Sequence, residues 1–422
     1  MEKYKMLYGK CGIEIGGPST FFDGRVLDIY KNAKSIDGAN FSSHTIWEGD
    51  IVEGDTFKAG GKIGHQYICD ATDLNKIESG KYDFVMSSNA FEHIANPLKA
   101  LCEFLRILKP EGILLLVLPN KDTPNFDHNR KITKMQHLID DFRNDVLEDD
   151  LTHLGEELLF HDLPMTPECG NRNFFMERSL KNAENRCLHQ HVFDMDLLEQ
   201  IFNYFSLNII QQDTLSPTIS GDFIIMGNKK SLIQTNEEEG HYLTDKGVIH
   251  NYLPIYEKLF SPLRYDSINI FEVGYMYGAS CRLWERYFPK AKIKSIDKRI
   301  EELRPDIKLL FEFKNLLNKF IQPDPFRIIL DVIDIKDVTP RYFSDFSPDI
   351  AIDDGSHLIK DQMHFIKIVY PILKEGGLLI VEDIQDIDNQ KMEFDKLGIP
   401  YEIIDRRIEQ NLHDEVLLIF KK

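Results

Sequence analysis

Short apolar runs, each followed by a polar turn that often contains glycine, recur along the whole chain. In the first half these runs predict strands at residues 12–15, 33–37, 66–70, 82–87 and 113–119. A helix is predicted at 97–108, where apolar residues recur at helical spacing. Because strands and helices alternate, the pattern predicts an α/β domain with a parallel, doubly wound sheet.

The second half of the chain repeats this plan. Strands are predicted at 268–273, 293–296, 349–352 and 378–381. A glycine turn and a helix follow the first of them, which indicates a duplication of the fold within one chain. We therefore expect two tandem domains, at residues 1–228 and 241–422. The charged stretch 229–240 has no apolar period and is expected to be a linker.

An insertion at about 121–200 precedes the last two predicted strands of the first half, 207–214 and 222–227. It is polar and rich in histidine and arginine, namely His128, Arg130, His137, His153, His161, Arg178, Arg186, His189 and His191. Two interpretations remain open: a solvated helical cap whose histidines satisfy local carbonyls, or a surface that binds phosphate or carboxylate groups. A metal site built from His189 and His191 has no support from ligand spacing.

Acidic side chains end two consecutive predicted strands of the second half. Asp354 follows one strand, and Glu382 and Asp383 follow the next. Consecutive parallel strands point the same way, so their carboxyl ends lie side by side, where open α/β sheets bind ligands. Clustered carboxylates repel one another unless a cation joins them, and Mg²⁺ takes oxygen ligands. We expect Mg²⁺ there, with His357 as general base; the alternative is that these acids only cap strands and helices.

The composition is that of a soluble globular protein, with 422 residues, 42% of them hydrophobic and 28% charged. A net charge of −19 argues against nonspecific binding to nucleic acid, which needs a basic surface. No apolar run is long enough to span a membrane and the start of the chain has no signal-peptide core, so a cytoplasmic location is expected. The six cysteines form no CxxC pair, which disfavours a zinc site or a disulfide framework. The sequence leaves the oligomeric state open, and a homo-oligomer is one of the alternatives.

The first predicted strand runs into Gly16-Gly17-Pro18-Ser19, a turn in which glycine lets the backbone approach a ligand closely. A tight turn without a ligand would have the same sequence. Asp37 ends the second predicted strand, where its carboxylate can accept hydrogen bonds from a ribose. Together, GIEIGGPS, CDATDL and YDFVMSSNAFEHIANPLKALCEFLRILKPEGILLLVLP resemble the class I S-adenosylmethionine-dependent methyltransferases.

That resemblance implies a Rossmann-like domain that binds S-adenosylmethionine. The contacts it implies are Glu14 and Gly16 at the methionine end, Asp37 at the ribose, Asp70 near the adenine, and Gly17, Ala71 and Ser87. The turn departs from the family, because Gly17-Pro18-Ser19 replaces the commoner Gly-x-Gly. His93 and His128 are the candidates for a catalytic base in this half.

The second half is similar to a different branch. TDKGVIHNYLPIYEKLF, FEVGYMYGASCRLWERYFP, SIDK, IDDGSH and GGLLIVEDI, within about residues 241–386, resemble the macrolide-sugar O-methyltransferases and the proteins labelled cephalosporin hydroxylase. In the sugar-methylating members the corresponding residues hold Mg²⁺ and a catalytic histidine, which implies the same roles for the acids and for His357. The implied cofactor contacts are Glu272, Gly274, Gly278, Ser280, Asp297, Asp334 and Asp353.

These features predict a bifunctional S-adenosylmethionine-dependent O-methyltransferase that methylates sugar hydroxyls of a glycan or sugar precursor. A methyl group on sulfonium is already activated, so the protein must align donor and acceptor and remove the hydroxyl proton. Two alternatives remain open: one half is silent and serves for binding or assembly, or the acceptor is a small molecule other than a sugar. Hydroxylation is disfavoured, because non-haem iron sites prefer two histidines and one carboxylate.

Overall fold

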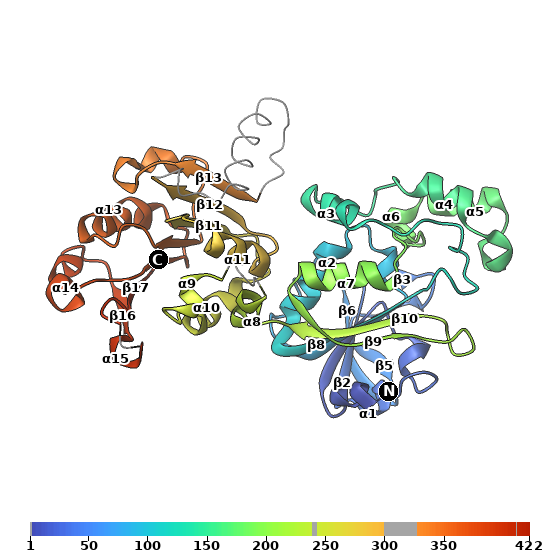
Figure 1. The fold of residues 1–422 in the computed structure, drawn as a ribbon. Coiled ribbons are helices and arrows are strands. Elements are labelled where there is room, and N and C mark those ends of the chain that lie inside the picture. Colours follow the sequence, from blue (N-terminus) through green and yellow to red (C-terminus); the bar gives the residue numbers. More distant parts are fainter. Residues whose placement is uncertain (1, 239–242, 299–326, 411) are drawn as a thin grey trace. The chain divides into compact units, whose positions relative to one another are not determined.

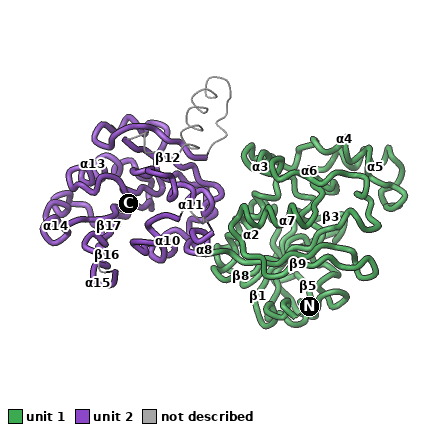
Figure 2. Tube along the Cα trace, in the orientation of Figure 1, with its two compact units in different colours: residues 1–230 green, residues 231–422 purple. Residues whose placement is uncertain are grey.

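The computed structural model describes residues 2–238, 243–298, 327–410 and 412–422. The chain divides into two compact units, Met1–Lys230 and Ser231–Lys422 (Figure 2). Residues 239–242, which belong to the expected linker and to the start of the expected second domain, lie outside the described residues.

The first unit contains an eight-stranded sheet in the order β5-β6-β2-β1-β7-β8-β10-β9 (Figure 1). Strands β6, β2, β1, β7 and β8 run parallel, whereas β5, β10 and β9 are antiparallel to their neighbours. The strands are β1 Cys11–Ile15, β2 Ser35–Asn40, β5 Gly54–Ala59, β6 Lys62–Ile68, β7 Tyr82–Ser88, β8 Leu108–Leu118, β9 Leu207–Thr214 and β10 Phe223–Lys229, with a separate ribbon of β3 His44–Thr45 and β4 Gly49–Asp50. The helices are α1 Ile29–Asn32, α2 Pro97–Ile107, α3 Met135–Arg143, α4 Leu154–Phe160, α5 Arg172–Ser179, α6 Asn182–Asn185 and α7 Met195–Tyr204.

The second unit repeats the topology with seven strands in the order β13-β12-β11-β14-β15-β17-β16. Its strands are β11 Asn269–Val273, β12 Lys292–Asp297, β13 Ile328–Val332, β14 Ile350–Asp353, β15 Leu378–Val381, β16 Tyr401–Asp405 and β17 Val416–Lys421. Its helices include α8 Leu232–Glu237, α9 Asp245–Val248, α10 Leu253–Phe260, α11 Ala279–Tyr287, α13 Ile359–Val369, α14 Ile387–Asp395 and α15 Arg407–Gln410. Both units are doubly wound α/β domains, which confirms the predicted fold class. None of the helices in the described ranges is both long and apolar enough to cross a bilayer.

Each sheet has a central strand at which the direction of the strand order reverses. In the first unit β1 lies between β2 and β7, and in the second β11 lies between β12 and β14. The crevice beyond the carboxyl ends of strands at such a reversal is where open α/β sheets bind ligands.

The apolar runs of the second unit are continuous because its parallel strands are buried on both faces. Ile270 and Ile352 pack on one face with Trp284. Phe271 and Ala351, their sequence neighbours, pack on the other face in a second cluster. Because side chains of a strand point alternately to its two faces, one apolar run contributes residues to two separate cores.

The second strand of the first unit is longer than predicted. It was expected to end at Asp37, but β2 continues to Asn40, and Ala39 pairs with Ile15 of β1. The apolar pattern stops at Gly38 because this position has no room for a side chain: an added Cβ would lie 2.1 Å from the ring of Phe57. The next strand was expected at 66–70, whereas β6 ends at Ile68, and its hairpin partner β5 was not predicted at all.

The expected linker contains helix α8. Ser231 caps this helix in a reciprocal capping box with Gln234. Leu232 is fully buried in the core of the second unit with Tyr252 and Tyr256. The only two apolar residues of this short helix are adjacent, buried Leu232 and exposed Ile233, so they leave no periodic signal. The sequence pattern therefore failed here, and the boundary between the units falls at 230/231.

Expressed separately, residues 1–230 and 231–422 should each fold, because each unit has its own sheet and core. A control fragment, 238–422, lacks Leu232 and α8 and should be less stable than 231–422 by at least about 2 kcal/mol, the lower range for losing a buried leucine. Thermal and urea unfolding followed by circular dichroism measures both. An unfolded 231–422 fragment beside a stable full chain would show that the units share a core.

Candidate active sites of the two units

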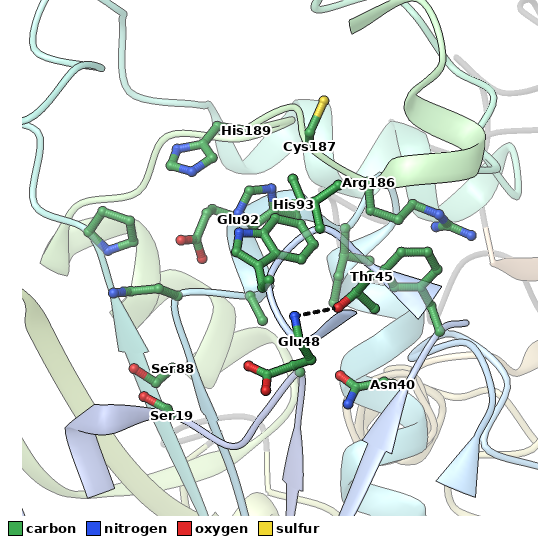
Figure 3. A pocket seen from close by; sticks show the side chains of 18 of the residues that line it. Ser19, Asn40, Thr45, Glu48, Ser88, Glu92, His93, Arg186, Cys187 and His189 are labelled. Carbon is green, nitrogen blue, oxygen red and sulfur yellow. Dashed lines mark hydrogen bonds between the residues drawn. The ribbon is translucent and has the colours of Figure 1, made fainter. Parts of the chain in front are cut away.

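A cavity of about 690 Å³ lies at the carboxyl ends of the central strands of the first unit (Figure 3). Its wall includes Gly16 after β1, Asn40 at the end of β2, Asp70 after β6 and Ser88 at the end of β7. Four neighbouring strand ends thus contribute to one cavity at the point where the strand order reverses. Its volume is within the range of about 300–1,000 Å³ that is usual for small-molecule and cofactor sites.

Four of the residues that the sequence nominated for this unit line the cavity: Gly16, Asp70, Ala71 and His93. Asp37 does not, because it lies within β2, where it accepts hydrogen bonds from His65 N at 2.9 Å and from the Tyr82 hydroxyl at 2.6 Å. Asn40 occupies the strand end instead, and its Nδ2 donates to Gly17 O at 2.9 Å. The expected polar residue at the end of this strand is therefore Asn40, three positions after Asp37.

Two other nominated residues also lie outside the cavity wall. Ser87 donates its hydroxyl to Ile15 O at 3.0 Å, while its neighbour Ser88 lines the cavity, since adjacent residues of a strand face opposite sides. His128 Nδ1 lies 2.7 Å from Asn125 O, on the surface of the insertion. We therefore place neither residue among the reacting groups.

Glu14 and Gly17 shape the first turn from inside. Glu14 is fully buried, and its carboxyl accepts hydrogen bonds from the Tyr30 hydroxyl and from Ser19 N at 3.0 Å. Burial raises the pKa of Glu14 to about 8. A Cβ on Gly17 would lie 2.1 Å from the carboxyl carbon of Glu14, so glycine at this position makes room for the buried acid.

The insertion supplies the other side of the cavity, where Arg186, Cys187 and His189 lie opposite the strand ends (Figure 3). Arg186 bridges the two sides: its guanidinium lies 2.8 Å from Asp70 Oδ2 and 2.7 Å from Glu148 Oε2. Asp70 is thereby held by an ion pair at the cavity edge.

Buried Glu92, Asp127 and His189 and partly buried His93 form a cluster at one end of this site. His189 Nδ1 lies 2.5 Å from Asp127 Oδ2, and neither oxygen of Glu92 has a hydrogen-bond partner. Burial raises the pKa of Glu92 to about 7 against the opposing effect of His189. Burial also lowers the pKa of His93, assisted by His189, whereas Asp127 raises the pKa of His189 despite its burial. An unpaired carboxyl poised near neutrality in a cavity is a suitable general base.

Sequence reasoning missed Glu92 as a functional candidate and named His189 only as one of the histidines of the insertion. Glu92 adjoins His93 in the turn after β7, so the motif pointed to the right place but to the neighbouring side chain. His189 gave no local signal, because its partner Asp127 lies 62 residues away in the chain.

In the second unit, buried Lys246 lies among the carboxylates at the ends of the central strands. Its Nζ donates to Asp354 and to both oxygens of Glu382, at 2.8 and 2.9 Å, and lies 3.6 Å from Glu272 Oε1. Although burial opposes it, these carboxylates raise the pKa of Lys246 well above its usual value. The sequence analysis did not identify this lysine, which precedes the sheet by more than twenty residues.

The structure brings Asp354, His357 and Asp383 together beside this lysine. Each offers one possible ligand atom, and these atoms all lie within 4.8 Å of one another. His357 Nδ1 lies 3.6 Å from Asp383 Oδ2 and is buried without a hydrogen-bond partner. His357 and Asp383 both have a positive φ, +54° and +52°. This conformation is uncommon for residues other than glycine and occurs preferentially at functional sites.

These residues fit a divalent cation, because the site holds more carboxylates than cations. The carboxylates are Glu272, Asp353, Asp354, Glu382, Asp383 and Glu415, whereas the neighbouring basic groups are Lys246, His250 and His357. Burial and the charge of Asp354 raise the pKa of Asp383. Both oxygens of Glu382 accept hydrogen bonds from Lys246, whereas Lys246 engages Oδ2 of Asp354 and the Tyr252 hydroxyl engages Oδ1 of Asp383. We therefore take the second oxygens of Asp354 and Asp383 as the ligand atoms for a metal.

The remaining nominated residues of this unit surround the first turn and the strand ends. Glu272 accepts hydrogen bonds from Ser280 Oγ at 3.0 Å and from Trp284 Nε1 at 3.2 Å, and so anchors α11. A Cβ on Gly274 would lie 1.9 Å from Asp354 O, so this glycine permits a close approach of two strand-end loops. The others are Gly278, which precedes α11 at φ +72°, Asp297, which accepts from Met276 N at 2.8 Å, Asp334, which pairs with Lys336 at 2.9 Å, and Asp353, where burial raises the pKa to about 7.

Comparison with known proteins agrees with this fold. Residues 15–186 match the family described as methyltransferase domain. The chain is 29% identical over 154 residues to the 8-demethyl-8-alpha-L-rhamnosyl tetracenomycin-C 2'-O-methyltransferase of Streptomyces olivaceus, which covers 34% of this chain and 35% of that protein. It is 27% identical over 203 residues to the mycinamicin VI 2''-O-methyltransferase of Micromonospora griseorubida, covering 45% of this chain and 44% of that protein.

Among solved structures, the chain is similar to the MycE methyltransferase of the mycinamycin biosynthetic pathway in complex with Mg and SAH. The TM-score is 0.33 at 21% identity, and the match covers 44% of this chain and 54% of that one. The chain thus spans less than half the length of the curated relatives named above. The matched residues 15–186 lie within the first unit, which therefore resembles a methyltransferase domain. Over 34–45% of its length the chain resembles these O-methyltransferases.

Proposed function

We propose that this protein is an S-adenosylmethionine-dependent O-methyltransferase that acts on sugar hydroxyls of a glycan or sugar precursor. The similarity to O-methyltransferases whose names specify sugar positions supports the acceptor class. The observation that carries the proposal is the cluster of Asp354, His357 and Asp383 at the strand ends of a doubly wound sheet. Incubating the full chain with methyl-labelled cofactor and a panel of glycosides and sugar nucleotides tests it. The proposal fails if label enters none of them.

In the second unit, we assign Asp354 and Asp383 to hold Mg²⁺, with Glu382 behind them. When bound, the ion lowers the pKa of a coordinated hydroxyl. His357 is the group placed to accept the proton, and Asp383, 3.6 Å from its Nδ1, stabilises the charged ring. Burial raises the pKa of Glu382 well above its usual value, and the ion pair with Lys246 opposes this rise.

In the first unit, we assign the role of base to Glu92. The cavity wall carries Asn40 and Asp70 for the cofactor, and Glu92 faces the same cavity with both oxygens unpaired. The Asp127–His189 pair lies beside it, and His189 opposes the rise in the pKa of Glu92 that burial causes. A silent first unit that serves for binding is the second candidate, favoured by the Gly17-Pro18-Ser19 turn in place of Gly-x-Gly.

Titration of the full chain with S-adenosylmethionine should show two binding events, one for each unit. Asn40→Ala should weaken one event and Asp297→Ala the other, each by about tenfold or more, which corresponds to roughly 1.4 kcal/mol. Asp37→Asn is the matched control, because Asp37 lies outside the cavity wall. Isothermal titration calorimetry gives the stoichiometry. A single event that Asn40→Ala leaves unchanged would show that the first unit binds no cofactor.

A further inference from the structure

Four side chains of the insertion meet outside the cavity: His137, Asp141, His153 and His191. His137 and Asp141 are one turn apart on α3, and His153 directly precedes α4. His191 lies in the segment that leads to α7, two residues after His189. One possible ligand atom from each residue lies within 4.8 Å of the others.

Hydrogen bonds alone do not satisfy the polar atoms of this cluster. His137 Nε2 lies 2.8 Å from His153 Nε2 and 3.3 Å from Asp141 Oδ2. A neutral ring carries one N–H, so His137 Nε2 cannot donate well to both neighbours. His191 is 1% exposed, and its Nδ1 has no hydrogen-bond partner although it is buried. Leaving such an atom unpaired costs about 1–3 kcal/mol.

Desolvation favours the neutral form of the ring of His191, which is buried, and of His153, which is partly buried. Neutral imidazole is a common metal ligand. His191 Nε2 also lies 3.1 Å from Ala95 O, the kind of backbone contact through which metal-bound histidines fix their tautomer and orientation.

We propose that His137, Asp141, His153 and His191 bind one Zn²⁺ ion in a structural site. Three imidazoles and one carboxylate suit zinc, and four protein ligands with no open position are typical of structural zinc sites. Bonds of about 2.0–2.1 Å in a tetrahedron place ligand atoms about 3.3 Å apart. His137 Nε2 lies 2.8 Å from His153 Nε2 and 3.3 Å from Asp141 Oδ2, and both separations are close to this value. The site uses no cysteine, which is why the cysteine spacing gave no sign of it.

The ion would connect the insertion to the cavity. It would join α3, the start of α4 and the segment that contains His189. His191 N also donates to Glu92 O at 3.2 Å, so the same segment is tied to the turn that carries Glu92. Zinc would thereby order one wall of the cavity without touching a substrate.

The test uses the untagged full chain, treated with a chelator, incubated with ZnCl₂ and freed of excess metal by gel filtration. Mass spectrometry of the metal content should find about one zinc ion per chain. The double variant His137→Gln/His153→Gln should retain at least tenfold less zinc. Both positions are only partly buried, and far-UV circular dichroism checks that the variant is folded.

Two controls separate this site from other metal-binding groups of the chain. His128→Gln removes a histidine of the same insertion and should leave the zinc content unchanged. Asp354→Asn alters the cluster of the second unit and should also leave it unchanged. Co²⁺ in place of Zn²⁺ adds a visible absorption band that the double variant should lack. If the double variant does not fold, Asp141→Asn, which conserves shape, takes its place with the same readouts.

Zinc should also raise the melting temperature of the chelator-treated wild type and have no effect on the variant, since a ligand stabilises the state that binds it. A wild-type chain that retains no zinc would overturn the proposal. So would zinc and cobalt signals that persist unchanged in a folded double variant.

Discussion

Replacing His357 by alanine should slow methyl transfer by the second unit by about 10²–10⁴-fold, the usual contribution of a general base. His357 is the imidazole beside Asp354 and Asp383, and its Nδ1 is buried without a hydrogen-bond partner. Single-turnover assays in a Glu92→Gln background isolate the second unit. His413→Ala is the control, because this histidine is highly exposed and lies outside the cluster.

The same assays should show a need for a divalent metal. EDTA should abolish transfer by the second unit, and Asp354→Asn and Asp383→Asn should weaken Mg²⁺ binding, with partial rescue by excess Mg²⁺. His357→Ala should leave metal affinity intact, which distinguishes a base from a ligand. Transfer that persists in EDTA, with His357→Ala at the wild-type rate, would contradict the mechanism and leave only the fold in common with the sugar O-methyltransferases.

Glu92→Gln should slow methyl transfer by the first unit by about 10²–10⁴-fold. Because burial raises the pKa of Glu92 to about 7, the carboxylate that accepts a proton forms only as the pH rises through that value. The wild-type rate should therefore climb between about pH 6 and 8, and the residual rate of the variant should lack this step. Glu168→Gln is the control, since Glu168 lines the same cavity but is exposed.

The free energy of unfolding should depend on the same ionisation, but it should fall over the pH range in which the rate rises. A carboxyl whose pKa is raised on folding contributes stability that is fully present below its unfolded pKa of roughly 4.3. That contribution is lost as the pH rises to about 7, the value for folded Glu92. Glu92→Gln should thus flatten the loss of stability over this interval in urea unfolding at several pH values. A wild-type rate that is independent of pH near 7 would exclude Glu92 as the base.

Alternation of apolar runs and glycine turns was sufficient to predict two doubly wound domains, because the period of burial in a strand or helix is a local property. The convergence of Asp354, Asp383 and His357 also followed from the sequence. Strands β14 and β15 are parallel neighbours in which Asp353 pairs with Val381, so whatever follows them must meet. For residues that directly follow neighbouring parallel strands, the position in the sequence therefore predicts that their side chains lie close together.

Strand ends were less predictable than strands. Strand β2 was expected to end at Asp37 but ends at Asn40, because Gly38 interrupts the apolar run without ending the strand. The ring of Phe57 occupies the space that a side chain at Gly38 would need. The helix in the expected linker was missed for a related reason, since Leu232 and Ile233 are too few to show a helical period although Leu232 is buried. Local pattern carries no information about which neighbour covers a small or isolated residue.

Only the tertiary structure revealed the partners of the buried charges. Lys246 lies 108 residues from Asp354 and 136 from Glu382, and His189 lies 62 residues from Asp127. The four side chains of the proposed zinc site come from three separate segments. Whether a buried charge or an imidazole has a partner depends on the groups packed against it. Packing brings together segments that are far apart in the chain at no regular spacing, so no sequence pattern reveals them. The sequence therefore determined the order of strands and helices in the two domains and the meeting of Asp354 with Asp383. Packing decided where individual strands end and which side chains there are neutral, paired or unpaired.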